Sequence, residues 1–183
     1  MAIKKGDKIS EIVLPQISGS EYSTKKLIGQ NYMISFFRFA SCPFCNLRIH
    51  QLVNQYSEFG IGFTIVALFD SPLHNLIKHT SKHQAVFPIL ADEENKYYKI
   101  FGIKKSVIGV LAGIIKRFPA LMKSMFVYGN FPIEIKGSML TMPADFLIDE
   151  KGIVVEAYYG KDEGDHLPIE KVIEFSKQEP ENK

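Results

Sequence analysis

A chain of 183 residues, of which 46% are hydrophobic and 12% aromatic, is long enough to fold as one domain around its own core. The net charge of +2 is too small to predict a nucleic-acid partner. The first residues, MAIKKGDKISEI, are too charged for a secretory signal, and the most apolar stretch, residues 107–115, is much shorter than the roughly 20 residues of a membrane span. We therefore expect a cytoplasmic protein with no membrane span.

Short apolar runs alternate with segments of helical period along most of the chain, which predicts an α/β domain. The N-terminal part predicts a hairpin formed by residues 11–14 and 21–23, with Ser23 as the cap of a helical turn. Further strands are predicted at residues 31–39, 62–69, 86–90, 145–149 and 153–159. Helices are predicted at residues 43–59, 72–79, 92–101 and 168–176. Gly60 and Gly102 are placed to end the first and third of these helices.

Residues 104–141 interrupt this alternation of predicted strands and helices. This stretch is apolar and amphipathic, and Pro119 and Pro132 interrupt it. We predict that it is a helical insertion in a single domain covering residues 1–177, followed by a flexible tail at residues 178–183.

The two cysteines lie in the sequence C-P-F-C, at the boundary between a predicted strand and a predicted helix. Pro43 suits the first position of that helix, so Cys42 should cap it. The unpaired N–H groups and the dipole at a helix start favour a thiolate, so we expect an acidic Cys42. Cys45 follows almost one turn later, close enough to attack a disulfide formed at Cys42. Arg38 and Arg48 are cations that could lower the pKa of Cys42 further or bind an anionic substrate.

Two other interpretations of these cysteines remain. They can be small core residues, although a position between two elements argues against it. Alternatively, Cys42 and Cys45 could join His79 and His83 in a structural zinc site, because the two histidines share one face of a predicted helix. A proline after the first cysteine favours a helix over a zinc knuckle. We therefore prefer redox chemistry and predict no metal.

A second feature precedes the predicted strand at residues 145–149. Pro143 stands at the mouth of that strand, where it removes a donor from the hydrogen-bond ladder. A cis Met142–Pro143 bond would account for it, and would leave the Met142 backbone free to pair with a substrate strand beside the cysteines. An ordinary edge proline is the alternative.

With strand, C-P-F-C and helix early and M-P-A-D-F-L-I-D late, the chain resembles the thioredoxin-fold proteins. Within them it is most similar to the peroxiredoxin-like branch of the alkyl hydroperoxide reductase C and thiol-specific antioxidant (AhpC/TSA, or redoxin) family, a likeness extended by the segments GDKISEIVLPQISG and AYYGKDEGDHLP. The resemblance implies a central mixed sheet flanked by helices, an N-terminal β-hairpin and a helical insertion before a cis-proline strand. It makes Cys42 the nucleophilic or peroxidatic cysteine, Cys45 the resolving cysteine and Pro143 the cis-proline that faces them.

The chain departs from the family patterns in two places. Peroxiredoxins resemble one another in a P-x-x-x-T-x-x-C signature, whereas Ser35 and Phe39 stand where that proline and threonine would precede Cys42. Thioredoxins carry a buried acid on the strand before the motif, and the corresponding residues here, ISFF, include no carboxylate. Arg38 is a candidate to replace part of the peroxide-binding function.

We predict a thiol-disulfide oxidoreductase, or antioxidant redox protein, that cycles Cys42 and Cys45 between dithiol and disulfide. The alternative is a thiol-dependent peroxidase in which Cys42 attacks a hydroperoxide and the resulting sulfenic acid condenses with Cys45. The partners would be a disulfide-bearing protein or a peroxide and a thiol reductant of the thioredoxin or glutathione type, with no organic cofactor. The residues predicted to contact substrate are Arg38, Pro43, Phe44, Met142 and Pro143.

A third interpretation comes from a different class of protein. The chain could be a non-catalytic binding module in which residues 107–131 pack against a partner or a second copy of the chain, forming a homodimer. An amphipathic stretch of this kind is more often a core or subunit interface than a lipid-binding element.

Overall fold

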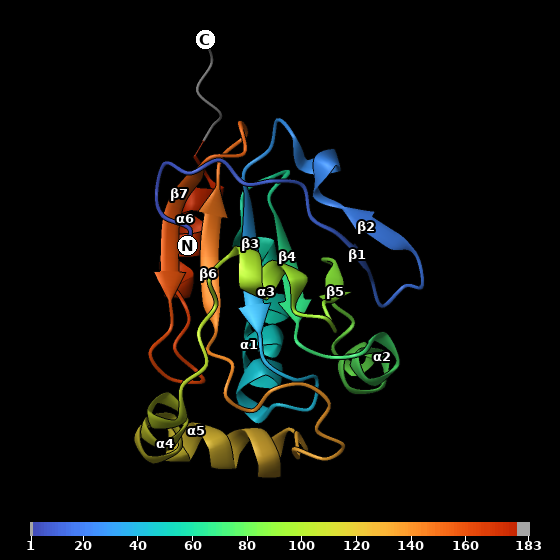
Figure 1. Cartoon of the computed structure of the whole chain (residues 1–183), viewed down its shortest axis with the longest axis vertical. Helices are drawn as coiled ribbons and strands as arrows, with labels where there is room; N and C mark the ends of the chain where they lie inside the picture. Colours follow the sequence, from blue (N-terminus) through green and yellow to red (C-terminus); the bar gives the residue numbers. More distant parts are fainter. Residues whose placement is uncertain (1, 179–183) are drawn as a thin grey trace.

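A five-stranded mixed sheet forms the centre of the structure, with the strand order β5-β4-β3-β6-β7 (Figure 1). The structure, a computed structural model, describes residues 2–178, so most of the predicted tail, residues 179–183, lies outside the described residues. β3 runs parallel to β4 and β4 to β5, whereas β6 runs antiparallel to β3 and β7. The strands are β3 (Tyr32–Phe37), β4 (Thr64–Phe69), β5 (Ile89–Ala91), β6 (Ala144–Ile148) and β7 (Val154–Tyr159). The predicted mixed α/β sheet is confirmed.

The N-terminal hairpin is also confirmed. β1 (Val13–Pro15) and β2 (Glu21–Ser23) pair antiparallel as a separate two-stranded sheet. The Ser23 hydroxyl accepts a hydrogen bond from the Lys25 N–H at 3.0 Å and caps the 3-10 turn Thr24–Leu27, as predicted.

Helices cover both faces of the sheet because side chains along each strand alternate between the faces. Met33 and Phe37 of β3 belong to an apolar cluster formed with three helices, whereas Ile34 and Phe36 belong to the cluster on the opposite face. The first cluster holds residues of α1 (Pro43–Asn54), α2 (Leu73–Thr80) and α6 (Ile169–Ser176). The second holds residues of α3 (Lys96–Ile100) and of the hairpin. Because both faces of β3 are covered, its side chains are all buried.

Two predicted helices are shorter in the structure. α1 ends at Asn54, and Tyr56–Glu58 form a separate 3-10 turn, so Gly60 does not end the helix. α3 begins only at Lys96, because Asn95 has a left-handed φ of 56° that a helix cannot include. The predicted extents of these two helices are therefore wrong, although both helices exist.

Residues 104–141, called segment 104–141 below, connect α3 to β6, and the two ends of the segment lie side by side. The N–H of Ser106 donates to the carbonyl of Leu140 at 2.8 Å, and the N–H of Met142 donates to the carbonyl of Lys104 at 2.9 Å. The segment contains α4 (Val107–Lys116), α5 (Phe118–Met122) and a π-helical turn (Lys123–Val127). It lies across the lower end of the molecule in Figure 1, next to the start of α1. Of the helices described, none is long and apolar enough to cross a membrane.

Candidate active site

Cys42 caps the first turn of α1, as predicted. Its backbone is extended, with φ −63° and ψ 123°, and Pro43 follows as the first helical residue. The N–H of Cys45 donates a hydrogen bond to Cys42 Sγ at 3.4 Å. The sulfur therefore faces the unpaired N–H end of the helix, where a negative charge is stabilised.

Arg38 lies beside this sulfur. Its Nη1 atom is 3.7 Å from Cys42 Sγ and 3.8 Å from the Glu163 carboxylate. Its other terminal nitrogen donates to the carbonyl of Met139 in segment 104–141. Arg38 and Glu163 are each only 3% exposed. A buried cation thus lies within contact distance of the thiol.

The two thiols are shifted in opposite directions. Burial alone would raise the pKa of Cys42, but the hydrogen bond from the Cys45 thiol, the Arg38 charge and the N–H groups of Cys45 and Phe44 outweigh it and lower the pKa to about 7. Burial, together with the neighbouring Cys42, raises the pKa of Cys45 well above its usual range. At neutral pH, Cys42 is therefore the group available as a thiolate and Cys45 the group that keeps its proton.

The thiols are covered by protein in this conformation. Cys42 and Cys45 are both 0% exposed and both are free, not joined in a disulfide. α4 approaches this region through its glycines: a Cβ added to Gly113 would lie 2.5 Å from the Glu163 carboxylate, and one added to Gly109 would lie 2.7 Å from Met142 Sδ. α4 therefore packs directly on residues that surround the thiol site.

The Met142–Pro143 prediction needs correction. No cis peptide bond occurs between residues 2 and 178, so Met142–Pro143 is trans and Pro143 is not a cis-proline. The pairing of β6 with β3 begins at Ala144, so the missing N–H of Pro143 removes nothing from that ladder. The Met142 N–H is not free for a substrate strand either, because it donates to the Lys104 carbonyl. Lys104 and Lys105, at the start of segment 104–141, pair with this stretch, so an added strand could not pair with the Met142 N–H.

The other predicted contact residues lie at the start of α1. The Pro43 carbonyl accepts a hydrogen bond from the Ser124 hydroxyl at 2.6 Å, which joins α1 to segment 104–141. Phe44 is buried and, with Arg48, lines a cleft of about 280 Å³ whose lining residues include neither cysteine. Arg48 donates to the Leu167 carbonyl at 2.7 Å. Of the two candidate arginines, the structure brings Arg38 to the thiol and directs Arg48 to the chain before α6.

The two histidines of the zinc alternative have other partners. The His83 ring nitrogen lies 2.7 Å from the Asn46 side-chain oxygen, and burial lowers the pKa of His83 to about 4. Asn46 in turn donates to the Cys42 carbonyl at 2.9 Å, so this pair supports the backbone of the thiol loop. His79 faces Glu134 at 4.0 Å. Within residues 2–178, no three His, Cys, Asp or Glu side chains are grouped to hold a metal ion.

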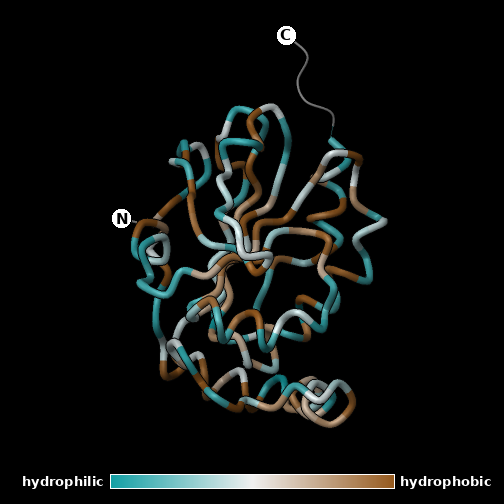
Figure 2. Tube along the Cα trace, turned by 90° about the vertical axis from the view of Figure 1, so that its right-hand side faces the viewer, coloured by the Kyte–Doolittle hydropathy of each residue, from teal (hydrophilic) through white to brown (hydrophobic). Residues whose placement is uncertain are grey.

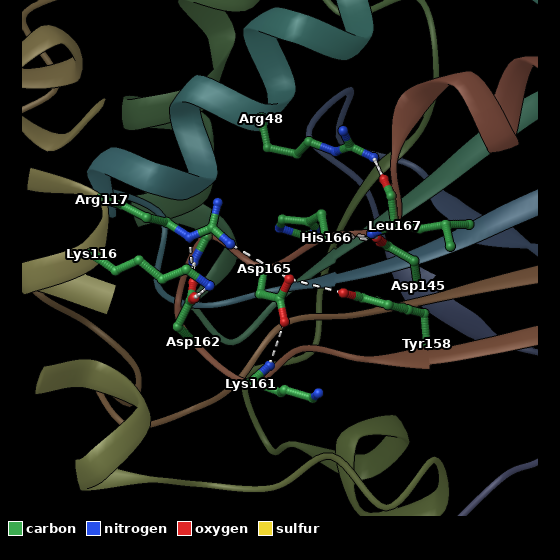
Figure 3. A network of polar contacts seen from close by, with 11 residues as sticks. Arg48, Lys116, Arg117, Asp145, Tyr158, Lys161, Asp162, Asp165, His166 and Leu167 are labelled. Atoms are coloured by element: carbon green, nitrogen blue, oxygen red, sulfur yellow. Dashed lines mark hydrogen bonds and ion pairs between the residues drawn. The ribbon is translucent and has the colours of Figure 1, made fainter. Parts of the chain in front are cut away.

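A buried carboxylate that sequence analysis missed lies under α1 (Figure 3). Asp145 on β6 pairs in register with Ser35 on β3, whose hydroxyl donates to it at 2.5 Å. It also accepts the Leu167 N–H at 2.7 Å and contacts His166 Nδ1 at 3.1 Å. Burial alone would raise the pKa of Asp145, but the His166 charge and hydrogen bond, the Arg48 charge and the Ser35 hydroxyl lower it to about 2. The neighbouring strand β6 thus carries a buried carboxylate, whose hydrogen bonds go to Ser35, His166 and Leu167.

Two further residues escaped sequence analysis. Glu163, the ion-pair partner of Arg38, lies in the segment AYYGKDEGDHLP, which was quoted for the family resemblance without a role for this carboxylate. His166 is an isolated histidine whose role the sequence leaves open. The only signal for Asp145 was its position in the predicted strand after Pro143, and the register that sets it against Ser35 was not predictable.

The fold is shared with several solved structures along nearly the whole chain. Peroxidoxin BcpB from Mycobacterium tuberculosis has a TM-score of 0.65 at 16% identity, over 96% of this chain and 97% of that chain. A PrxQ mutant from Xylella fastidiosa has a TM-score of 0.62 at 16% identity, over 95% of each chain. A putative thiol:disulfide interchange protein DsbE from Chlorobium tepidum has a TM-score of 0.58 at 18% identity, over 93% and 92%. No curated protein sequence matches the chain.

A thioredoxin-like sheet that carries an acidic thiol at the start of its first long helix defines a thiol-based oxidoreductase. The model of the AhpC/TSA family matches residues 5–157. The chain therefore belongs to the AhpC/TSA family, as the sequence motifs predicted.

Proposed function

We propose that the protein is a thiol-dependent peroxidase in which Cys42 is the peroxidatic and Cys45 the resolving cysteine. The observation that carries the proposal is the setting of Cys42 Sγ, with Arg38 Nη1 at 3.7 Å and the Cys45 N–H at 3.4 Å. These donors hold a thiolate near neutral pH and remain available to a substrate oxygen beside it.

The reaction has three steps. The Cys42 thiolate attacks one oxygen of a hydroperoxide, the O–O bond breaks, and the alkoxide leaves and takes a proton to become an alcohol; Cys42 is now a sulfenic acid. The Cys45 thiol then attacks that sulfur, a disulfide forms and water leaves. Two thiol groups, from one dithiol of the thioredoxin type or from two molecules of the glutathione type, then reduce the disulfide, restore Cys42 and Cys45 and leave as the oxidised disulfide of the reductant.

Two features favour a small hydroperoxide over a protein disulfide. The Met142 N–H already donates to the Lys104 carbonyl, so a substrate strand cannot pair with it in this conformation. Both sulfurs are fully buried, and Arg38 beside Cys42 is paired with Glu163, on which Gly113 of α4 packs. A small molecule needs less displacement of this cover than a second protein.

Dithiol-disulfide exchange is the second candidate. It is favoured by the C-P-F-C spacing, by the opposite pKa shifts of the two thiols, and by the likeness of the fold to the DsbE structure. In this case Cys42 would attack a disulfide of the substrate and Cys45 would release the product.

The deciding experiment compares both activities on the same reduced protein. Rapid mixing with hydrogen peroxide or an alkyl hydroperoxide should consume peroxide, and Cys42→Ser should abolish consumption. Cys45→Ser is the matched control: it should still consume one equivalent and stop at a sulfenic acid that a dimedone-type reagent traps. Efficient insulin reduction with negligible peroxide consumption would overturn the peroxidase proposal in favour of exchange.

The identity of the reductant is part of this proposal. Coupling the reaction in turn to a thioredoxin system and to glutathione would show which of the two sustains turnover. The cytoplasmic location stays a prediction from the sequence.

A further inference from the structure

Exposed apolar side chains are concentrated in segment 104–141. Of the 18 large hydrophobic side chains that are exposed in the described part of the chain, 13 lie between residues 107 and 140. Figure 2 shows this segment at the lower end of the molecule, apart from the sheet. A monomeric soluble protein rarely leaves so many apolar side chains together, so this concentration indicates a binding surface.

α4 is inverted relative to an ordinary surface helix. Its buried residues are Gly109 and Gly113, whereas Ile108, Leu111 and Ile115 are 82%, 58% and 78% exposed. These three residues share one face of the helix because they follow the spacing i, i+3, i+7. A surface helix normally turns such a stripe toward the core. Here the small residues face the protein and the aliphatic residues face outward.

The inverted helix is firmly attached to the rest of the molecule. Arg117, at the junction of α4 and α5, donates to Asp162 at 2.6 Å and contacts Asp165 at 3.5 Å (Figure 3). Ser124 donates to the Pro43 carbonyl at 2.6 Å. The polar and small groups of the segment therefore hold its inner side in place, and the outward direction of the apolar side is fixed by these contacts.

The same segment concentrates positive charge. It contains six Lys or Arg residues and one acidic residue, Glu134, whereas the rest of the chain contains 16 basic and 19 acidic residues. Glu134 is itself paired with Lys78 at 2.7 Å. The lysines at positions 104, 105, 116 and 123 are exposed near the ends of α4 and α5. The apolar surface is thus bordered by cations in a molecule that is otherwise slightly acidic.

We propose that the outer face of α4 and α5 docks on a membrane surface that contains anionic lipid. An outward aliphatic stripe bordered by lysines is the pattern of a helix that lies in the interface between headgroups and acyl chains. α4, with 10 residues, is about 15 Å long, half the thickness of the hydrocarbon core, so it lies on the bilayer and does not cross it.

A second copy of the chain is the alternative occupant, as in the homodimer predicted through residues 107–131. A two-fold contact would bring this face against its own copy. Arg117 and Lys116 contact Asp162, but Lys104, Lys105 and Lys123 on each copy would lie around the apolar stripe. Their mutual repulsion costs free energy that an anionic surface would instead recover. The charge of the segment therefore favours lipid.

Vesicle flotation with the full chain tests the proposal. The protein should float with vesicles of equal parts phosphatidylcholine and phosphatidylglycerol, much less with phosphatidylcholine alone, and salt should weaken the binding. Ile108→Glu should weaken it by about tenfold or more, because a fully buried isoleucine contributes ~1.5–3 kcal/mol. Ile61→Glu is the matched control, since Ile61 is even more exposed than Ile108 but lies outside the segment, and should bind as the unchanged protein does.

Charge is tested in the same way. Lys123→Gln should weaken binding about fivefold, the equivalent of ~1 kcal/mol for one lysine near an anionic surface, whereas the exposed Lys5→Gln should have no effect. Binding does not depend on the thiols, so Cys42→Ser should float as well as the unchanged chain. The docking proposal can therefore fail or succeed independently of the proposed reaction.

Three results would overturn the proposal. One is the absence of flotation with either vesicle. Another is equal binding to both kinds of vesicle that salt does not weaken, which would show that anionic lipid is not required. The third is a dimer in sedimentation that Ile108→Glu converts to a monomer while vesicle binding is absent, which assigns this face to a second copy of the chain.

Discussion

Cys42 and Cys45 are equally buried and only one helical turn apart, yet their pKa values move in opposite directions. Cys42 has three kinds of donor around it: a thiol, an arginine and the N–H groups of the helix start. Cys45 has the Arg38 N–H at 3.4 Å, but burial and the neighbouring sulfur dominate its surroundings. Burial alone therefore does not decide whether a cysteine is reactive, because the Cys45 thiol, the Arg38 charge and the helix N–H groups together outweigh it at Cys42.

The largest expected effect comes from isolating each thiol. In Cys45→Ser, Cys42 should be alkylated readily at pH 7, with a pH midpoint close to the value of about 7 in the unchanged protein, since the Arg38 charge and the helix N–H groups remain and the serine hydroxyl can donate in place of the thiol. In Cys42→Ser, Cys45 should react much more slowly at pH 7, because burial still raises its pKa and keeps it protonated. Iodoacetamide labelling followed by mass spectrometry measures both rates. Equal rates would show that the two environments do not differ as the structure indicates.

Asp145 extends the comparison to a third buried acid. It is as buried as Cys45, but it has partners as Cys42 does, and its pKa is about 2. A folded-state pKa below the unfolded value of 3.8 stabilises the fold above that value, and this stability is lost as the pH falls through the folded-state pKa. Between pH 6 and pH 2, the free energy of unfolding measured with urea should therefore fall by about 2 kcal/mol less in Asp145→Asn than in the unchanged protein.

Glu174→Gln is the control for Asp145, because Glu174 is an exposed acid on α6. It should leave the pH dependence of unfolding nearly unchanged. If both variants have the same pH dependence as the unchanged protein, the contacts of Asp145 do not hold its charge in the way described.

Arg38→Met removes the positive charge that lies 3.7 Å from Cys42 Sγ, together with the ion pair to Glu163. Removal of the nearby positive charge should raise the pKa of Cys42 and reduce the thiolate below pH 7 by about tenfold. The alkylation rate against pH should shift to higher pH in this variant. Arg48→Met is the matched control, because Arg48 is a buried arginine on α1 whose donor contacts are to Leu167 and Gln51. An identical shift in both variants would indicate a general loss of packing and not a contact with the thiol.

Much of the fold was predictable from local patterns. The C-P-F-C sequence between an apolar strand and an amphipathic helix placed Cys42 at the helix start, because proline and the helix period are local signals. The register between β3 and β6 was not predictable in this way, since it joins Ser35 to Asp145 across 110 residues of sequence. The hydrogen bond from the Met142 N–H to the Lys104 carbonyl was not predictable for the same reason, because it joins residues far apart in the sequence.

The orientation of α4 shows a different limit. Its period identifies an apolar face, but the usual assumption that this face is buried was wrong for α4. The spacing of Gly109 and Gly113 was the available signal, since two glycines four residues apart allow a helix to approach another part of the chain closely. The sequence could show that the segment was unusual, and only the packing shows which side faces outward.

The smallest expected effect concerns how closely α4 packs on the residues around Cys42. Gly109→Ala would place a methyl group 2.7 Å from Met142 Sδ and 2.8 Å from the Lys161 carbonyl, an overlap that costs ~1–3 kcal/mol unless α4 moves outward. Alkylation of Cys42 should become several-fold faster at every pH, with an unchanged pH midpoint, because access changes and the donors do not. Ile108→Ala, on the outer side of the same helix, is the control and should leave the rate unchanged. A shifted pH midpoint in Gly109→Ala would mean that α4 helps to set the pKa of Cys42. An unchanged alkylation rate would mean that the reagent reaches the thiol by a path that α4 does not close.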